Sequence, residues 1–232
     1  MPFESALPFL VVPLLGLIGS LYLEISVELH EQAIAFHQHA LRLLETPTGR
    51  MAGASAWADL GLCAITTGDL QLAESVLETG LTYPNILYHM ERPRILSGAA
   101  LLALKKGDLE TASQQALASV AFSEEHAMRN HQPFSYLVLG KVYLAAGQYE
   151  QALKYSAQAE EIATTLGMRP IVWQACLLAA RTLNAGSSTD LARVKLDQAR
   201  RLVGEIAAQM QDEQLKQAYL TGAIQSLGLQ YS

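Results

Sequence analysis

The sequence predicts an all-α protein, a right-handed superhelix of about five stacked helix pairs that ends in a capping helix. Three series of small or apolar residues recur along the 232-residue chain with the same offsets of 40, 39, 40 and 40 residues. A fixed period of this length is typical of helical repeat arrays, and the three series occupy both halves of each period. Each unit is therefore expected to hold two packed helices. The series are Ala33, Ala73, Ala112, Ala152 and Ala192; Leu21, Gly61, Ala100, Gly140 and Ala180; and Ala40, Gly80, Ser119, Ala159 and Ala199.

The composition is that of a folded, mildly acidic protein. Half of the residues are hydrophobic and 16% are charged, which is too apolar for a disordered chain. The 22 acidic residues outnumber the 16 basic ones, and the basic residues form no cluster, so direct binding of nucleic acid is not expected. Cys63 and Cys176 lie three repeats apart, too far for a disulfide, which favours a reducing, cytoplasmic location.

The N-terminal segment, residues 1–13, is apolar and precedes the first unit. Residues 5–23 carry no charge, and a membrane span needs about 20 apolar residues. Pro8 and Pro13 interrupt this stretch, and no basic residue precedes it as in a signal peptide. We favour a buried first repeat helix. Membrane contact through residues 5–23, self-association through this helix, and a chain that begins inside a longer array with upstream domains remain open alternatives.

Turn residues mark the units. Glycine at positions 68, 107 and 147 supplies the left-handed conformation that ends a first helix, and Asp69 or Asp108 can cap the second helix. In the last unit, residues 184–190 indicate a longer turn. The amphipathic stretch from Asp212 to Ser226 is expected to cover the open end of the stack. The expected units are residues 14–46, 52–84, 92–128, 132–167 and 170–209, followed by the capping helix and tail at 210–232.

The residues that follow this pattern resemble the tetratricopeptide repeat (TPR). They are Trp57, Leu60, Gly61, Ala64, Gly68, Leu70 and Ala73 in one unit, and Tyr136, Leu139, Gly140, Tyr143, Gly147, Tyr149, Ala152 and Ala159 in another. The period near 40 is longer than the usual 34, and is similar to the long repeats in the C-terminal sensor regions of bacterial signalling ATPases of the MalT type. The resemblance implies a TPR-like solenoid that binds an effector or partner. The chain has no phosphate-binding loop motif, so it corresponds to the sensor part alone or to an adaptor.

A binding groove is expected on the concave wall, which the first helix of each pair forms. The residues next to the core-facing positions around the circumference of each first helix should line it. The predicted partner-binding residues are Arg94, Ser97, Lys105, Phe134, Lys141, Gln174, Arg181 and Asn184. Their four cations form a positive line on an acidic protein, which predicts an acidic or carboxylate-bearing partner segment, with Phe134 contributing to apolar pockets. Chance placement of the four cations, or pairing with neighbouring acids, is the alternative interpretation.

No catalytic residue, metal ligand or cofactor is expected. His37 and His39 lie two apart on a helix and point to different faces, and no third ligand accompanies them. Cys63 and Cys176 lie within apolar helices, so we expect them to be buried there as small hydrophobic residues. No Ser, His and Asp set can be brought together from the sequence.

The predicted function is that of a non-enzymatic module for protein–protein interaction. It would bind a peptide or partner segment in the concave groove, as an adaptor or as the sensor part of a bacterial signalling protein. The alternative is a regulatory domain of a larger signalling ATPase or transcription regulator that binds a small-molecule effector. Gln174, Asn184 and Trp173 leave room for that alternative.

Overall fold

The computed structural model describes residues 34–36, 38–39, 42, 54–82 and 88–228. Within these residues the chain is helical and contains no strand, so the predicted all-α solenoid is confirmed. The helices are α3 (Ala54–Thr67), α4 (Leu70–Thr82), α5 (Tyr88–Lys106), α6 (Leu109–Glu125), α7 (Gln132–Ala145), α8 (Tyr149–Thr165), α9 (Arg169–Ala185), α10 (Thr189–Ala208) and α11 (Glu213–Leu227). The apolar segment 1–13 and almost all of the first expected unit, 14–46, lie outside the described residues.

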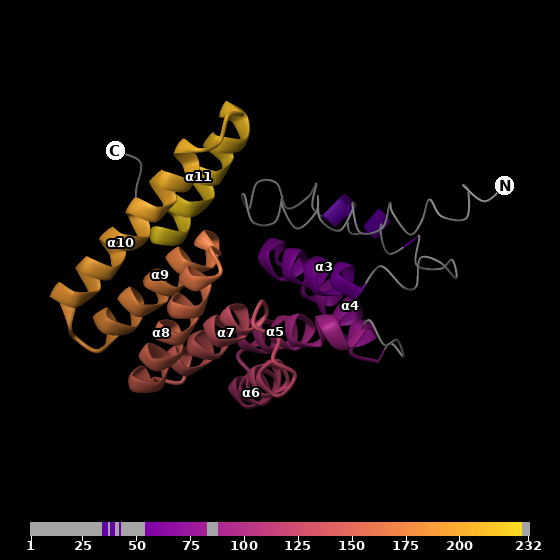
Figure 1. Ribbon diagram of the computed structural model, residues 1–232. Coiled ribbons are helices and arrows are strands. Elements are labelled where there is room, and N and C mark those ends of the chain that lie inside the picture. Colours follow the sequence, from indigo (N-terminus) through magenta and orange to yellow (C-terminus); the bar gives the residue numbers. More distant parts are fainter. Residues whose placement is uncertain (1–33, 37, 40–41, 43–53, 83–87, 229–232) are drawn as a thin grey trace.

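Successive helices form hairpins that stack in chain order. The pairs α3–α4, α5–α6, α7–α8 and α9–α10 follow one another, and α11 packs at the far end (Figure 1). Their buried side chains make one continuous core. Leu101 packs against both the first and the second cluster of buried residues, and Ile171 packs against both the second and the third. None of the helices in the described ranges is both long and apolar enough to cross a membrane.

A left-handed residue closes each hairpin turn. Gly68, Gly107 and Gly147 have φ values of +88°, +82° and +72°, which residues with a Cβ adopt only at a cost. The Asp69 carboxylate then accepts a hydrogen bond from the Leu72 amide, and the Asp108 carboxylate accepts one from Thr111, both at 3.0 Å. These caps satisfy amides at the start of α4 and α6.

The last hairpin turn is shorter than the sequence indicated. The longer turn expected over residues 184–190 is wrong, because α9 continues to Ala185 and α10 begins at Thr189. Ser187, 40 residues after Gly147, takes the left-handed conformation with φ 64°. The Ser188 amide donates to the Leu183 carbonyl at 2.8 Å, the same bond that Gln148 makes to Tyr143 at 2.9 Å. The repeat geometry therefore imposes this turn even without glycine.

Small side chains let neighbouring helices approach closely. A Cβ added at Gly61 would lie 2.6 Å from both Cγ and Cδ2 of Leu77, and one added at Gly80 would lie 3.1 Å from Trp57 Cβ. Between α5, α6 and α7 the position equivalent to Gly80 is the polar residue Ser119. The Ser119 hydroxyl lies 2.9 Å from that of Ser97 and 2.8 Å from that of Ser135. Serine keeps the helices close here while pairing buried hydroxyls with one another.

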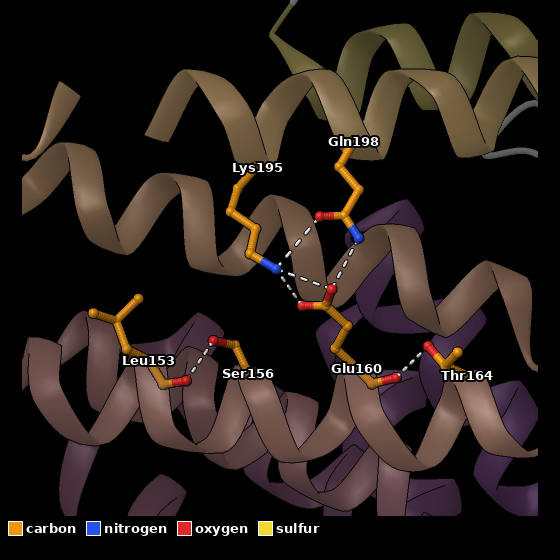
Figure 2. Close-up of polar contacts among 6 residues, drawn as sticks. All are labelled: Leu153, Ser156, Glu160, Thr164, Lys195 and Gln198. Atoms are coloured by element: carbon orange, nitrogen blue, oxygen red, sulfur yellow. Dashed lines mark hydrogen bonds and ion pairs between the residues drawn. The ribbon is translucent and has the colours of Figure 1, made fainter. Parts of the chain in front are cut away.

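The second helices of adjacent hairpins are also joined by polar contacts. Lys195 Nζ on α10 donates to both carboxylate oxygens of Glu160 on α8, at 2.9 and 2.7 Å. Gln198 Nε2 donates to the same carboxylate at 2.9 Å (Figure 2). The groups are partly buried, so this network fixes the relative placement of α8 and α10 with a modest stabilisation.

We expect Gly61→Ala to destabilise the protein by about 1–2 kcal/mol, because displacing the fully buried Leu77 costs more than the helix propensity gained. Gly204→Ala is the matched control. Gly204 also lies inside a helix, α10, but nothing lies within 4 Å of an added Cβ, so a gain of about 0.5–1 kcal/mol is expected. Urea unfolding of both variants measures the difference. Equal effects would contradict the close-approach interpretation.

Candidate partner-binding groove

One large groove of about 630 Å³ runs along the first helices of the hairpins. Its wall is made by α3, α5, α7 and α9, by the residues that lead into α7 and α9, and by α11 at one end. The lining residues are Leu62, Thr66, Arg94, Leu101, Leu104, Asn130, His131, Phe134, Lys141, Leu144, Ala145, Met168, Pro170, Ile171, Trp173, Gln174, Leu177, Leu178, Arg181, Tyr219, Gly222, Ala223 and Ser226. The groove has the size of a site for a small ligand or a short peptide segment.

The charge of the groove is opposite to that of the protein. Its described lining contains Arg94, Lys141 and Arg181 but no Asp or Glu, although acids outnumber bases in the whole chain. The remaining lining is mostly apolar. A positively charged, largely apolar surface of this kind favours ligands that carry both acidic and apolar groups.

Arg94 already forms an ion pair with a buried acidic side chain. Its guanidinium forms an ion pair with Asp59 of α3, whose side chain is 0% exposed. Burial raises the pKa of the nearby Glu91, whereas the positive charge of Arg94 lowers it. Burial, and secondarily Arg94, lower the pKa of His131 on the same wall. Arg94 therefore balances the buried Asp59 charge and holds α3 against α5.

Lys141 and Arg181 lie at equivalent positions of adjacent repeats, each one residue after the small residue of the 40-residue series. Lys141 is half-buried and makes no hydrogen bond or ion pair within the described part of the chain. Burial, and then the charge of Arg181, lower its pKa from the ordinary 10.5 to about 8. Arg181 Nη2 donates to the Ser226 carbonyl of α11 at 2.6 Å. No carboxylate in the described groove lining neutralises these two cations.

The structure brings together five of the predicted site residues. Arg94, Phe134, Lys141, Gln174 and Arg181 all line the groove. Ser97 does not, and its prediction was wrong, because it is fully buried between α5 and α6, where its hydroxyl meets Ser119.

Lys105 and Asn184 are exposed near the C-terminal ends of α5 and α9 and do not line the groove. An error of one residue in the expected helical phase was enough to misplace Ser97, since consecutive residues point about 100° apart around a helix.

Two residues in or beside the groove were missed from the sequence. Asp59 stands alone among apolar residues of α3, and its charge in that run was the available signal for a buried ion pair. Tyr219 lies within the stretch that was expected to form the capping helix. It is buried, but it also forms part of the groove wall together with Trp173. No sequence signal indicated that α11 reaches into the groove.

The α9–α11 end of the groove contains buried polar atoms. Trp173 is 8% exposed and Tyr219 is 3% exposed. The Trp173 N–H and the Tyr219 hydroxyl lie within reach of one another, although the contact falls short of ideal hydrogen-bond geometry. Burial raises the pKa of Tyr219 to about 12, and the nearby Trp173 N–H and the charge of Arg169 lower it to a smaller extent. The phenol therefore stays protonated and remains a donor at neutral pH.

The described residues lack a metal-binding cluster and a reactive thiolate. They contain no group of three His, Cys, Asp or Glu side chains that could hold a metal ion. Burial raises the pKa of Cys63 and Cys176 to about 12, so both remain thiols rather than thiolates at neutral pH. The arrangement is suited to binding by charge and shape.

Comparison with known proteins supports the repeat assignment. Residues 135–165, which cover most of α7 and α8, match the family model described as tetratricopeptide repeat. This stretch contains a TPR. TPR arrays typically act as non-catalytic scaffolds for protein–protein interaction, and their concave surfaces are the usual binding faces. No curated protein matches the chain significantly.

Among solved structures, the chain is similar to nearly identical TPR-like repeats from a protein of Podosopora anserina that is described as a kinesin light chain. The identity is 23%, the match covers 78% of this chain and 86% of that chain, and the TM-score is 0.48.

We expect Lys141→Met to stabilise the protein by about 1 kcal/mol at pH 7, because it removes a partly desolvated charge that has no acidic partner among the described residues. The pKa of Lys141 is lowered on folding, so its destabilising effect is fully present below about pH 8. That effect disappears as the pH rises to 10.5, where the unfolded chain also loses the proton.

Urea unfolding at pH 7 and pH 10 should therefore show a gain that shrinks at the higher pH. Lys105→Met, at an exposed lysine outside the groove, is the control and should change little. A loss of stability in Lys141→Met would show that this lysine holds the fold together instead.

Proposed function

We propose that the protein binds an acidic, extended segment of a partner protein in the groove along α3, α5, α7 and α9. The absence of Asp and Glu from the described lining, on a chain with net charge −6, is the observation that carries the proposal. A surface that gathers cations against the overall charge of the molecule attracts an acidic partner and orients it.

Within the groove, Lys141 and Arg181 are the anion-binding pair. Arg94 already balances Asp59, whereas Lys141 has no acidic partner in the described residues, and Arg181 donates only to a backbone carbonyl there. A carboxylate between Lys141 and Arg181 would relieve their mutual repulsion and gain charge-assisted hydrogen bonds from both. Phe134 and the leucines of the lining would contact the apolar side chains of the segment.

The protein would serve as an adaptor, or as the sensor part of a bacterial signalling protein in the cytoplasm. The long repeat, similar to that of MalT-type sensor regions, supports the sensor role. A second candidate is a small acidic effector bound at the same place, which the groove volume of about 630 Å³ would also admit. Both candidates use Lys141 and Arg181, and they differ in how far along the groove the ligand extends.

The double variant Lys141→Gln/Arg181→Gln tests the proposal. Affinity selection from a displayed library of random-sequence peptides, followed by fluorescence anisotropy of a selected peptide, measures binding. We expect the natural protein to enrich peptides that contain Asp or Glu, and the double variant to bind them at least about tenfold more weakly, because two charge-assisted contacts are lost.

The matched control is Lys105→Gln/Arg193→Gln, which removes the same charge from exposed positions outside the groove. It should bind within about twofold of the natural protein. Enrichment of peptides without acidic residues, or equal weakening by both double variants, would contradict the acidic segment. Competition by a small dicarboxylate such as glutarate at the same affinity as the peptide would favour the small effector.

A further inference from the structure

One position of the repeat lines the groove in four successive hairpins. The residue at this position comes directly after the small residue of the 40-residue series, and the intervals between its four copies are 39, 40 and 40 residues. The copies are Leu62 on α3, Leu101 on α5, Lys141 on α7 and Arg181 on α9, and all of them belong to the groove lining. Because each hairpin meets the next in the same way, these side chains form a row across the first helices.

The row is apolar in one half and cationic in the other. On α3 and α5 it consists of Leu62, which is buried, and Leu101, which is half-buried, and Leu104 adds apolar lining one turn further along α5. On α7 and α9 it consists of Lys141 and Arg181, which are close enough for the charge of Arg181 to lower the pKa of Lys141. The described lining holds no carboxylate that neutralises them.

Arg94 does not extend the cationic half onto α5. It lies seven residues before Leu101, roughly 10 Å away along the helix, and it is paired with Asp59. On the other side of Arg181 the wall passes to α11, where the Ser226 carbonyl accepts a hydrogen bond from Arg181. The leucines of the row therefore lie on one side of the two cations.

The spacing of the row can be compared with that of an extended chain. Packed helices lie about 8–10 Å apart, and an extended segment advances about 3.3–3.6 Å per residue, so about three residues pass each helix. A carboxylate held between Lys141 and Arg181 is one and a half helix spacings from Leu101, which corresponds to about four residues of the segment. Leu62 is one spacing further, at about six or seven residues from the carboxylate.

We propose that this row recognises a linear motif in the bound segment, an acidic residue at Lys141 and Arg181 with apolar residues about four and about six or seven positions to one side of it. The nearer apolar residue contacts Leu101 and the farther one contacts Leu62. This inference rests on the proposed function, and it adds the apolar half of the motif and the direction of the segment. The acidic end lies at α9 and the apolar end at α3.

The side-chain profile of peptides selected from the random-sequence library tests the proposal. Peptides that bind the natural protein are aligned on their acidic residue, and apolar residues are counted at each position on both sides of it. We expect Leu, Ile, Val, Met or Phe to be enriched about four residues to one side. A weaker maximum is expected at about six or seven residues on the same side, because Leu62 is less exposed than Leu101. Serine in place of the nearer apolar residue of a selected peptide should weaken binding about five- to tenfold.

Leu101→Lys tests the assignment of the nearer position. The variant places a third cation next to the other two in the row, so the selected peptides should carry a second acidic residue where the natural protein selects an apolar one. Leu117→Lys is the matched control. It makes the same change on α6 at a side chain that is 43% exposed and outside the groove lining, and it should keep the natural profile.

The proposal is overturned if the natural protein selects the acid without the nearer apolar residue, or with apolar residues equally on both sides. It is also overturned if a folded Leu101→Lys protein keeps the apolar preference. In each of these cases the acid is still selected and the proposed function stands. If no acid is selected at all, the proposed function fails and this inference with it. The profile of the natural protein and the serine-substituted peptide decide the question even if Leu101→Lys folds poorly.

Discussion

The close approach of neighbouring helices is the constraint on which the rest of the structure depends. One residue per helix must be small enough for the next helix to pack against its backbone, as Gly61 is against Leu77 and Gly80 is against Trp57. Because this requirement recurs about every 40 residues, every hairpin meets the next in the same way. The first helices therefore lie side by side and form one continuous groove wall. Where Ser119 stands in place of the Gly80 and Ala159 of other repeats, its hydroxyl pairs with those of Ser97 and Ser135.

The groove combines features that cost stability with features that the fold requires. Asp59 and Arg94 neutralise one another across α3 and α5, so that pair belongs to the scaffold. Lys141 has no such partner in the described residues, and burial lowers its pKa. Tyr219 and Trp173 bury a hydroxyl and an N–H that lie close to one another. Charges without a nearby acidic partner, such as that of Lys141 among the described residues, are typical of binding sites, where stability is given up for recognition. The position of Lys141 beside Arg181 supports the proposal that this part of the groove binds the partner.

The repeat period was enough to predict the solenoid from the sequence, because the helix-contact residues are small and regularly spaced. The same register brought Phe134, Lys141 and Arg181 to one wall. It could not separate Ser97, which turns into the helix interface, from Arg94 on the same helix, since a small phase error moves a side chain to another face. Asp59 was missed because a buried ion pair depends on two helices distant in sequence. Ser187 was missed because serine rarely takes the left-handed conformation that the repeat imposes on it.

The central claim is that Lys141 binds the acid of the partner segment. Its pKa, followed by nitrogen NMR of the lysine ammonium groups and assigned with Lys141→Met, tests this claim most directly. In the free protein we expect a pKa of about 8, well below the ordinary 10.5. An acidic peptide should raise the pKa of Lys141, because a neighbouring carboxylate favours the charged form. A pKa that stays unchanged while the peptide is bound would contradict the account.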